Sequence, residues 1–249
     1  ERHGRGLGLL ALGMGVGFSV GPALGGVLVD ALGWRAVFLF RAPLALGLAS
    51  VAALGRGAAR GGGAWQFPPR GEWLRWSVLR VLLLGGLANW GQFAVWLLAP
   101  FYLVGVLRLA PRVGGLFFML TPLGTAALAP LAGWLTDRVG SRWPVVAGLL
   151  VEALGLVAIS RFSADTPAAL VAVGLALVGL GLGLFQVPNL AQGMAAFPAA
   201  RQGGAGGLAF MSRTLGTVLG VQVTATLFGA LDPRLGFAPA FRAAFVAAA

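Results

Sequence analysis

The fold is decided by residues 6–32, which read GLGLLALGMGVGFSVGPALGGVLVDAL and carry no charged side chain before Asp30. A helix needs about 20 mainly apolar residues to cross the hydrocarbon core of a bilayer. Further apolar runs follow at about 36–54, 76–106, 113–135, 143–160, 167–190 and 203–231, with a shorter one at 236–249. We therefore expect an all-α integral membrane protein with about seven complete transmembrane helices and a truncated eighth.

The composition excludes an ordinary water-soluble domain. Hydrophobic residues make up 58% of the 249 residues and charged residues only 10%, whereas soluble domains carry about 25% charged residues. Barrel strands would be about 10 residues long with alternating polarity, and the sequence lacks that pattern. Long apolar runs rich in Leu, Ala and Gly indicate helices instead.

The strong positive charge is distributed along the chain. The net charge is +11 and all 18 basic residues are arginines, scattered singly or in small groups at the ends of apolar runs. Nucleic-acid binding needs clustered cations, so we expect no nucleic-acid partner. The loops at 55–75, 136–142 and 198–202 belong to the side with more arginines, which predicts that this side is cytoplasmic.

Missing residue types exclude several chemistries. Without lysine the chain cannot form the phosphate-binding loop GxxxxGK[ST]. It has no cysteine, and His3 is its single histidine, which argues against a zinc site and a serine–histidine triad. We therefore expect no enzyme, no metal and no cofactor; energy must come from an ion gradient or another chain.

A glycine ladder in the first apolar run forms the first motif. Glycines at this spacing remove side chains from one face and let another helix approach closely, and a proline inside a helix bends it. On the residues alone, a simple packing stripe is an equally good interpretation. The spacing G-x8-G-x3-GP-x2-GG is formed by Gly8, Gly17, Gly21, Pro22, Gly25 and Gly26.

This spacing resembles the antiporter motif in the fifth helix of major facilitator drug exporters. The resemblance implies that four helices precede this chain and that its segments are helices five to twelve. Residues 1–54 would then be the last two helices of an N-terminal bundle, and residues 76–249 a truncated C-terminal bundle. The polar, Gly- and Pro-rich residues 55–75 would be the cytoplasmic linker between them.

A second motif lies between the fourth and fifth apolar runs. It consists of Gly133, Asp137, Arg138, Gly140 and Arg142, and is similar to the hydrophilic loop GxLxDRxGxR of the same family. Gly140 allows a tight turn, and Asp137 can cap the next helix or pair with a neighbouring arginine. The resemblance implies a gating loop; a solvated charged turn is the alternative.

The loop and helix at 198–220 also look like those of the drug:proton antiporter branch. The resemblance implies proton-coupled export of drugs or other hydrophobic, often cationic compounds through a multi-pass protein of a bacterial cytoplasmic membrane, monomeric when full length. The linker is too short and polar for the two extra helices of fourteen-helix exporters, which favours twelve helices. The alternatives are a metabolite or nutrient carrier of the same fold and a non-transporting membrane scaffold.

Polar residues inside apolar helices are candidates for a substrate cavity. In the third run, Asn89, Gln92 and Trp96 fall within about 60° on one helical face. The family's seventh and tenth helices line its central cavity, which adds Gln186 and Asn189 from the sixth run. Hydrogen bonding between helices remains the alternative for these five residues.

Other single residues carry weaker expectations. Glu152 is the one carboxylate near the middle of a crossing and is a candidate proton site. The alternatives are that its carboxylate pairs with another side chain for structural reasons, or that it extends to the membrane–water interface. We expect Arg80 and Arg213 to anchor helices near the cytoplasmic surface. The glycines at 179, 181 and 183 are interpreted as packing positions, and the segment with Gly115, Gly124, Ala126 and Ala127 as the partner of the first glycine face.

Overall fold

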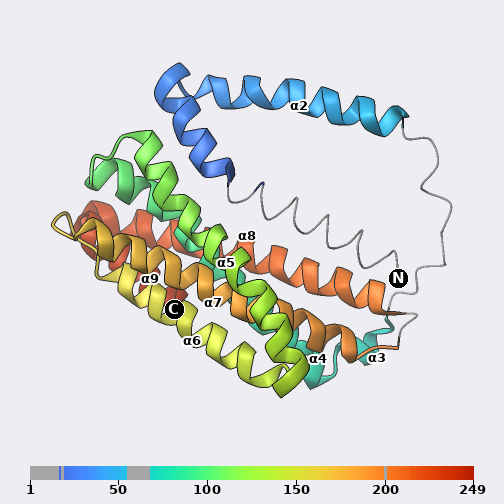
Figure 1. The fold of residues 1–249 in the computed structure, drawn as a ribbon. Coiled ribbons are helices and arrows are strands. Elements are labelled where there is room, and N and C mark those ends of the chain that lie inside the picture. Colours follow the sequence, from blue (N-terminus) through green and yellow to red (C-terminus); the bar gives the residue numbers. More distant parts are fainter. Residues whose placement is uncertain (1–16, 18–19, 55–67, 199–200) are drawn as a thin grey trace.

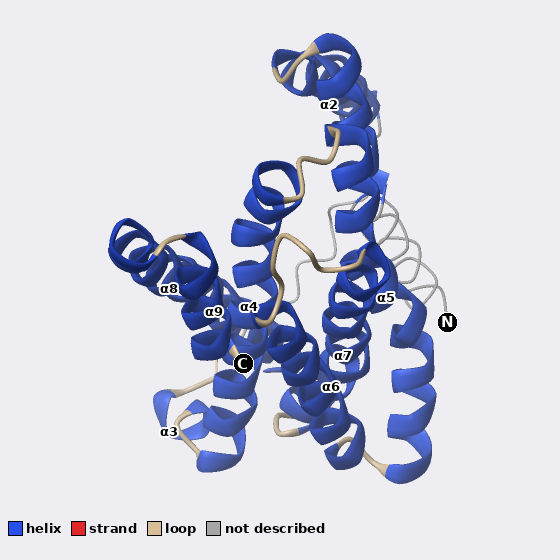
Figure 2. Cartoon of the chain, turned by 90° about the vertical axis from the view of Figure 1, so that its left-hand side faces the viewer, coloured by secondary structure: helices blue, strands red, loops and turns tan. Residues whose placement is uncertain are grey.

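The computed structural model describes residues 17, 20–54, 68–198 and 201–249, and every regular element in these ranges is a helix. The chain begins its described part with a helix at Val20–Leu32, and Gly33, with φ of +79°, makes the turn into α2 (Arg35–Leu54). Figures 1 and 2 show that α2 lies apart from the remaining helices. Gly8 of the glycine motif lies outside the described residues.

The remaining helices form one bundle (Figure 1). They are α3 (Arg70–Trp73), α4 (Trp76–Pro100), η1 (Phe101–Val106), α5 (Pro111–Val139), α6 (Arg142–Ser160), α7 (Ala168–Ala195), α8 (Gln202–Leu235) and α9 (Phe237–Ala248). The π-helix η1 directly continues α4 after Pro100, whose ring nitrogen cannot donate to a regular helical ladder.

Five helices in the described residues are long and apolar enough to cross a membrane: α4 with η1, α5, α6, α7 and α8. They match the third to seventh predicted runs, and α9 is short, as predicted. The first run is described only in part, and α2 is helical over its predicted length. The expected all-α membrane fold is therefore confirmed.

Helix α7 is the centre of the bundle because its glycines admit neighbours on two faces. Gly183 faces Thr125 of α5, where a β-carbon would lie 2.5 Å from the Thr125 carbonyl oxygen. On the α6 side, a β-carbon at Gly148 would lie 2.6 Å from the backbone nitrogen of Phe185. Such distances mean that the helix backbones touch, so packing explains the glycines of α7, as the sequence analysis predicts.

Helices α4 and α8 form a second close pair. Their backbones meet at Gly86 and Gly216. The Ser212 hydroxyl donates to the Leu82 carbonyl at 2.5 Å, and the Trp90 indole N–H donates to the Thr224 hydroxyl at 3.0 Å. These hydrogen bonds satisfy polar groups that would otherwise face an apolar surrounding.

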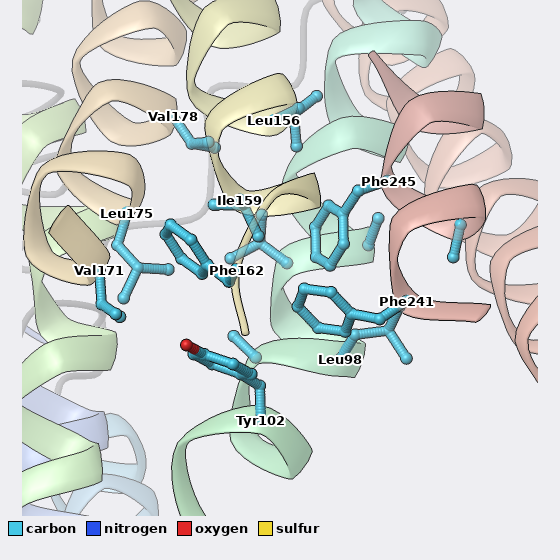
Figure 3. Packing of buried hydrophobic residues seen from close by; sticks show 14 of the residues in the cluster. Leu98, Tyr102, Leu156, Ile159, Phe162, Val171, Leu175, Val178, Phe241 and Phe245 are labelled. Atoms are coloured by element: carbon cyan, nitrogen blue, oxygen red, sulfur yellow. The ribbon is translucent and has the colours of Figure 1, made fainter. Parts of the chain in front are cut away.

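Figure 3 shows Tyr102, Phe162, Phe241 and Phe245 packed together in the apolar core. The Tyr102 ring packs against Phe162 and Phe241, each at a centroid distance of 5.4 Å, and its hydroxyl donates to the Ser163 carbonyl at 2.8 Å. Phe241 and Phe245 of α9 are 1% and 0% exposed. The short helix α9 is thereby fixed to α4 and α6 although it is only 12 residues long.

One end of the bundle is held by a salt bridge. Arg201, just before α8, binds the carboxylate of Glu72 in α3. Val78, Phe197 and Ala205 form a small apolar cluster beside this pair. The second part of the predicted linker therefore contains the short helix α3 and is attached to the bundle; residues 55–67 lie outside the described ranges.

Candidate functional site

A small pocket lies between α4, α7 and α8, at the end of the bundle nearer the α3 salt bridge. It has room for about one water molecule. Its apolar wall comes from Val81, Phe185, Leu190 and Ala209, and its polar wall from Gln186, Asn189 and Arg213; Gly85 completes the lining.

Asn189 is the most deeply placed polar group of this pocket. The side chain is 6% exposed, and its Nδ2 donates to the Val81 carbonyl of α4 at 3.2 Å. Its Oδ1 is buried and has no hydrogen-bond partner. Asn189 thus links α7 to α4, as the interhelical alternative predicts, and also presents a free acceptor.

The five predicted cavity residues are not brought together. Gln186 and Asn189 line the pocket, whereas Asn89, Gln92 and Trp96 do not. Asn89 is buried and donates to the Gly85 carbonyl of its own helix at 2.8 Å. Trp96 packs against Phe93 and Phe118 at centroid distances of 5.1 and 5.8 Å.

The antiparallel register of α4 and α7 explains this separation. Val78 of α4 clusters with Phe197, which follows α7, so the start of α4 lies beside the end of α7. Asn189 therefore meets Val81, while Gln92 lies eleven residues further along α4, or about 16 Å along the helix axis. The angle around a helix contains no information about the depth of a residue along the helix axis, which this register determines.

Arg213 is the pocket residue that the sequence analysis assigned differently. It was expected to anchor α8 near the surface, but it is only partly exposed and lines the pocket. Its Cγ would lie 3.6 Å from a β-carbon at Gly85. The available signal was its position inside an apolar run, eleven residues after the start of α8. Arg80, the other expected anchor, is exposed.

Glu152 lies at a different contact, between α6 and α4. It is 2% exposed, and its Oε1 would lie 3.1 Å from a β-carbon at Gly91. Neither carboxylate oxygen has a hydrogen-bond partner, and neither ion pair of the described residues includes Glu152. The alternatives of pairing and of reaching the interface are therefore wrong for the described part of the chain.

Among the described glycines of the motif, Gly26 is the one that meets a neighbouring helix. A β-carbon at Gly26 would lie 2.5 Å from the Pro111 carbonyl oxygen, and one at Gly115 the same distance from the Pro22 carbonyl oxygen. Gly17, Gly21 and Gly25 have no neighbouring heavy atom within 4 Å. The expected partner segment thus contacts the motif through Gly115, whereas Gly124 packs against α7. Arg112 and Asp30 add a salt bridge of 3.5 Å beside this contact.

The loop motif forms the turn between α5 and α6. Gly140 ends α5 with φ of +80°, a conformation that favours glycine, and Gly133 lies two turns earlier in α5. Arg138 stacks on Trp134 at 4.3 Å and Arg142 approaches Trp143 at 6.0 Å. Asp137 is exposed, makes no cap to α6 and pairs with no described arginine. Its expected capping or pairing is therefore not observed in the described residues.

Comparison with known proteins decides the family. Residues 1–221 match the sequence profile of the Major Facilitator Superfamily. This chain belongs to that superfamily. Superfamily membership and the five apolar helices identify a multi-pass membrane protein.

Three relatives show the range within the superfamily. The riboflavin transporter RibZ of Clostridioides difficile is 33% identical over 146 residues, 59% of this chain and 32% of RibZ. The multidrug resistance protein Stp of Mycobacterium tuberculosis is 28% identical over 297 residues, 94% of this chain and 55% of Stp. The drug efflux pump JefA of the same species is 25% identical over 279 residues, 89% of this chain and 54% of JefA.

The chain spans about half the length of Stp and JefA and about a third of RibZ. The alignments with Stp and JefA are longer than the 249 residues of this chain. Both relatives therefore contain residues that have no counterpart here. The resemblance to multidrug exporters inferred from the glycine and loop motifs is confirmed at the level of the superfamily and its drug-efflux members.

Proposed function

We propose that this chain is part of a secondary transporter that exports drugs or other hydrophobic compounds by alternating access, coupled to inward proton movement. The match to the superfamily over residues 1–221, with relatives named as multidrug exporters, carries this proposal. The absence of lysine, and hence of a GxxxxGK[ST] loop, favours an ion gradient over nucleotide binding by this chain.

In this proposal, residues 1–54 and 76–249 belong to two bundles joined by the cytoplasmic linker 55–75. The separation of α2 from the α4–α9 bundle supports this division (Figure 2). The short, polar linker favours a plan of twelve helices for the protein containing this chain. The glycine motif and the Gly133–Arg142 loop would act at the moving contacts between bundles, and the transporter would work as a monomer in the bacterial cytoplasmic membrane.

Glu152 is the proposed proton-binding residue in this chain. A buried carboxyl group without a partner is stable only when it carries a proton or meets a cation. The interface between α6 and α4 provides no described cation within ion-pair distance. Rocking of the helices that changes the access of water to Gly91 and Glu152 would then change the occupancy of the proton site.

Flux into vesicles tests this proposal. The intact protein, reconstituted in vesicles with an acidic interior, is expected to accumulate the dye ethidium or carboxyfluorescein, and a protonophore should abolish the accumulation. Glu152→Gln should remove the gradient dependence and leave the protein monodisperse, because the glutamine amide has the same shape but no titratable proton. Asp165→Asn, in the exposed turn between α6 and α7, is the matched control and should keep it.

Different results contradict different parts of the proposal. If the unchanged protein accumulates no dye, drug export is contradicted; if Glu152→Gln still responds to the gradient, the proton site lies elsewhere. Riboflavin uptake or release by the same vesicles would favour the metabolite carrier suggested by the relationship to RibZ. Flux that is unaffected by Gly21→Leu would show that the glycine face takes no part in transport.

A further inference from the structure

We propose that Arg213, Gln186 and Asn189 form an anion-accepting subsite, in which one oxygen of an acidic group of the substrate, such as a carboxylate, sulfonate or phosphate, occupies the space that the pocket has for about one water molecule. This inference rests on the proposed transport function and specifies the substrate class for it. The observation that carries it is a cation in a pocket between three helices that contains no acidic side chain.

The subsite is built into the helix packing. A β-carbon at Gly85 would lie 3.3 Å from Nδ2 of Asn189 and 3.6 Å from Cγ of Arg213. The missing side chain at Gly85 therefore leaves the space that these two polar side chains occupy. Gln186 lies one turn before Asn189 on α7 and lines the same pocket.

The charge of Arg213 is not balanced by the described part of the protein. The two ion pairs there are Arg112–Asp30 and Arg201–Glu72. A guanidinium group stays charged under all ordinary conditions, and a cation among apolar helices is costly unless an anion or water compensates it. Its N–H groups match two oxygens of one acidic group, so such a group is the ligand that the site would bind best.

Asn189 adds an acceptor to this subsite. Its Oδ1 is buried without a partner, whereas buried polar atoms in folded proteins are almost always hydrogen-bonded. A substrate with an O–H or N–H group next to its acidic group would satisfy both Arg213 and Asn189. Cationic compounds would meet like charge at Arg213 and be disfavoured, which differs from the cation preference suggested by family resemblance.

The local potential can be measured without knowing the substrate because residues 1–249 contain no cysteine. Ala209→Cys places one thiol in the pocket wall, in the intact protein with any cysteine outside these residues replaced by alanine. The thiol is treated with an anionic (sulfonatoethyl) and a cationic (trimethylammonioethyl) methanethiosulfonate. Ser163→Cys, in the exposed turn at the opposite end of the bundle, gives the intrinsic ratio of the two rates.

We expect the anionic-to-cationic rate ratio at residue 209, normalised to residue 163, to fall about tenfold with Arg213→Gln. Arg213→Lys should preserve the ratio within about threefold, since it keeps the positive charge. This variant therefore distinguishes an effect of lost charge from an effect of misfolding. An unchanged ratio in Arg213→Gln, or no reaction at residue 209 with either reagent, overturns the subsite. Because this readout involves no transport, it is independent of the vesicle experiment that tests the proposed function.

Discussion

Two glycine-rich regions of this protein have different surroundings. In α7 and its neighbours, glycines at 148, 155 and 183 bring helix backbones into contact. In the helix Val20–Leu32 and at Gly17, a β-carbon added at glycine 17, 21 or 25 would have no atom of another described segment within 4 Å. A glycine pattern therefore identifies a face without side chains, but only the structure shows whether a partner occupies it.

The difference also separates two kinds of helix contact. The α5–α7–α6 contacts are continuous and would resist separation, because a close-packed backbone interface has no room to slide. In the described residues, the first helix meets α5 around Pro22, Gly26 and Gly115, beside the salt bridge between Asp30 and Arg112. The α5–α7–α6 contact is suited to holding a bundle together. The contact between the first helix and α5 is suited to a joint between parts that move.

The largest expected effect is at the permanent contact. Gly148→Ala would place a methyl group 2.6 Å from the Phe185 nitrogen and 2.7 Å from the Gly181 carbonyl oxygen, both backbone atoms that cannot turn away. We expect a loss of about 1–3 kcal/mol of stability, measured as a lower Tm and a poorer size-exclusion profile in detergent. Gly206→Ala in α8, with no atom within 4 Å, is the control and should leave both unchanged. Equal behaviour of the two variants would refute the distinction.

A smaller effect is expected where the two regions meet. Gly115→Ala would place its methyl group 2.5 Å from the Pro22 carbonyl oxygen and push the first helix away from α5. The bundle should keep its Tm, since this contact lies outside it. Separation can be followed by disulfide formation between Asp30→Cys and Arg112→Cys, whose native side chains approach to 3.5 Å. Gly25→Ala is the control; unaltered cross-linking in Gly115→Ala would contradict the contact.

The smallest effect concerns hydrogen bonds inside the permanent contact. The Thr125 hydroxyl lies 3.1 Å from the Thr121 carbonyl and 3.0 Å from the Gly179 carbonyl. Thr125→Val keeps the shape and removes both interactions, which should cost about 0.6 kcal/mol. The thermal shift should be clearly smaller than that of Gly148→Ala. A larger shift would mean that hydrogen bonds, rather than backbone contact, determine the stability of this interface.

Much of the fold could be predicted because run length and hydropathy specify membrane helices directly. The structure starts α4 at Trp76 and ends α6 at Ser160, both as predicted. The ends of α5 and α8 extend four residues beyond the predicted ones, through Val139 and Leu235. At both ends the helix continues past its apolar run into polar residues. Hydropathy identifies the apolar run and therefore does not indicate where such a helix ends.

The candidate site was harder to predict because it depends on how far the helices are shifted along one another. The angle around α4 predicted that Asn89 and Gln92 share one face. The position of Asn189 beside Val81 depends instead on the register between α7 and α4, which the sequence does not show. Arg213 was missed as a pocket residue because a lone arginine in an apolar run suggests a side chain that reaches the interface. Only the packing of Gly85 against it shows that the side chain turns inward.

The bundle α4–α9 is fastened by different forces at its two ends. Charge joins Arg201 to Glu72 at one end, while the rings of Tyr102, Phe162 and Phe241 interlock at the other. Dissolved ions screen the salt bridge and have almost no effect on the aromatic packing. Rising ionic strength should therefore weaken the attachment of α3 to the start of α8 before it changes the aromatic end.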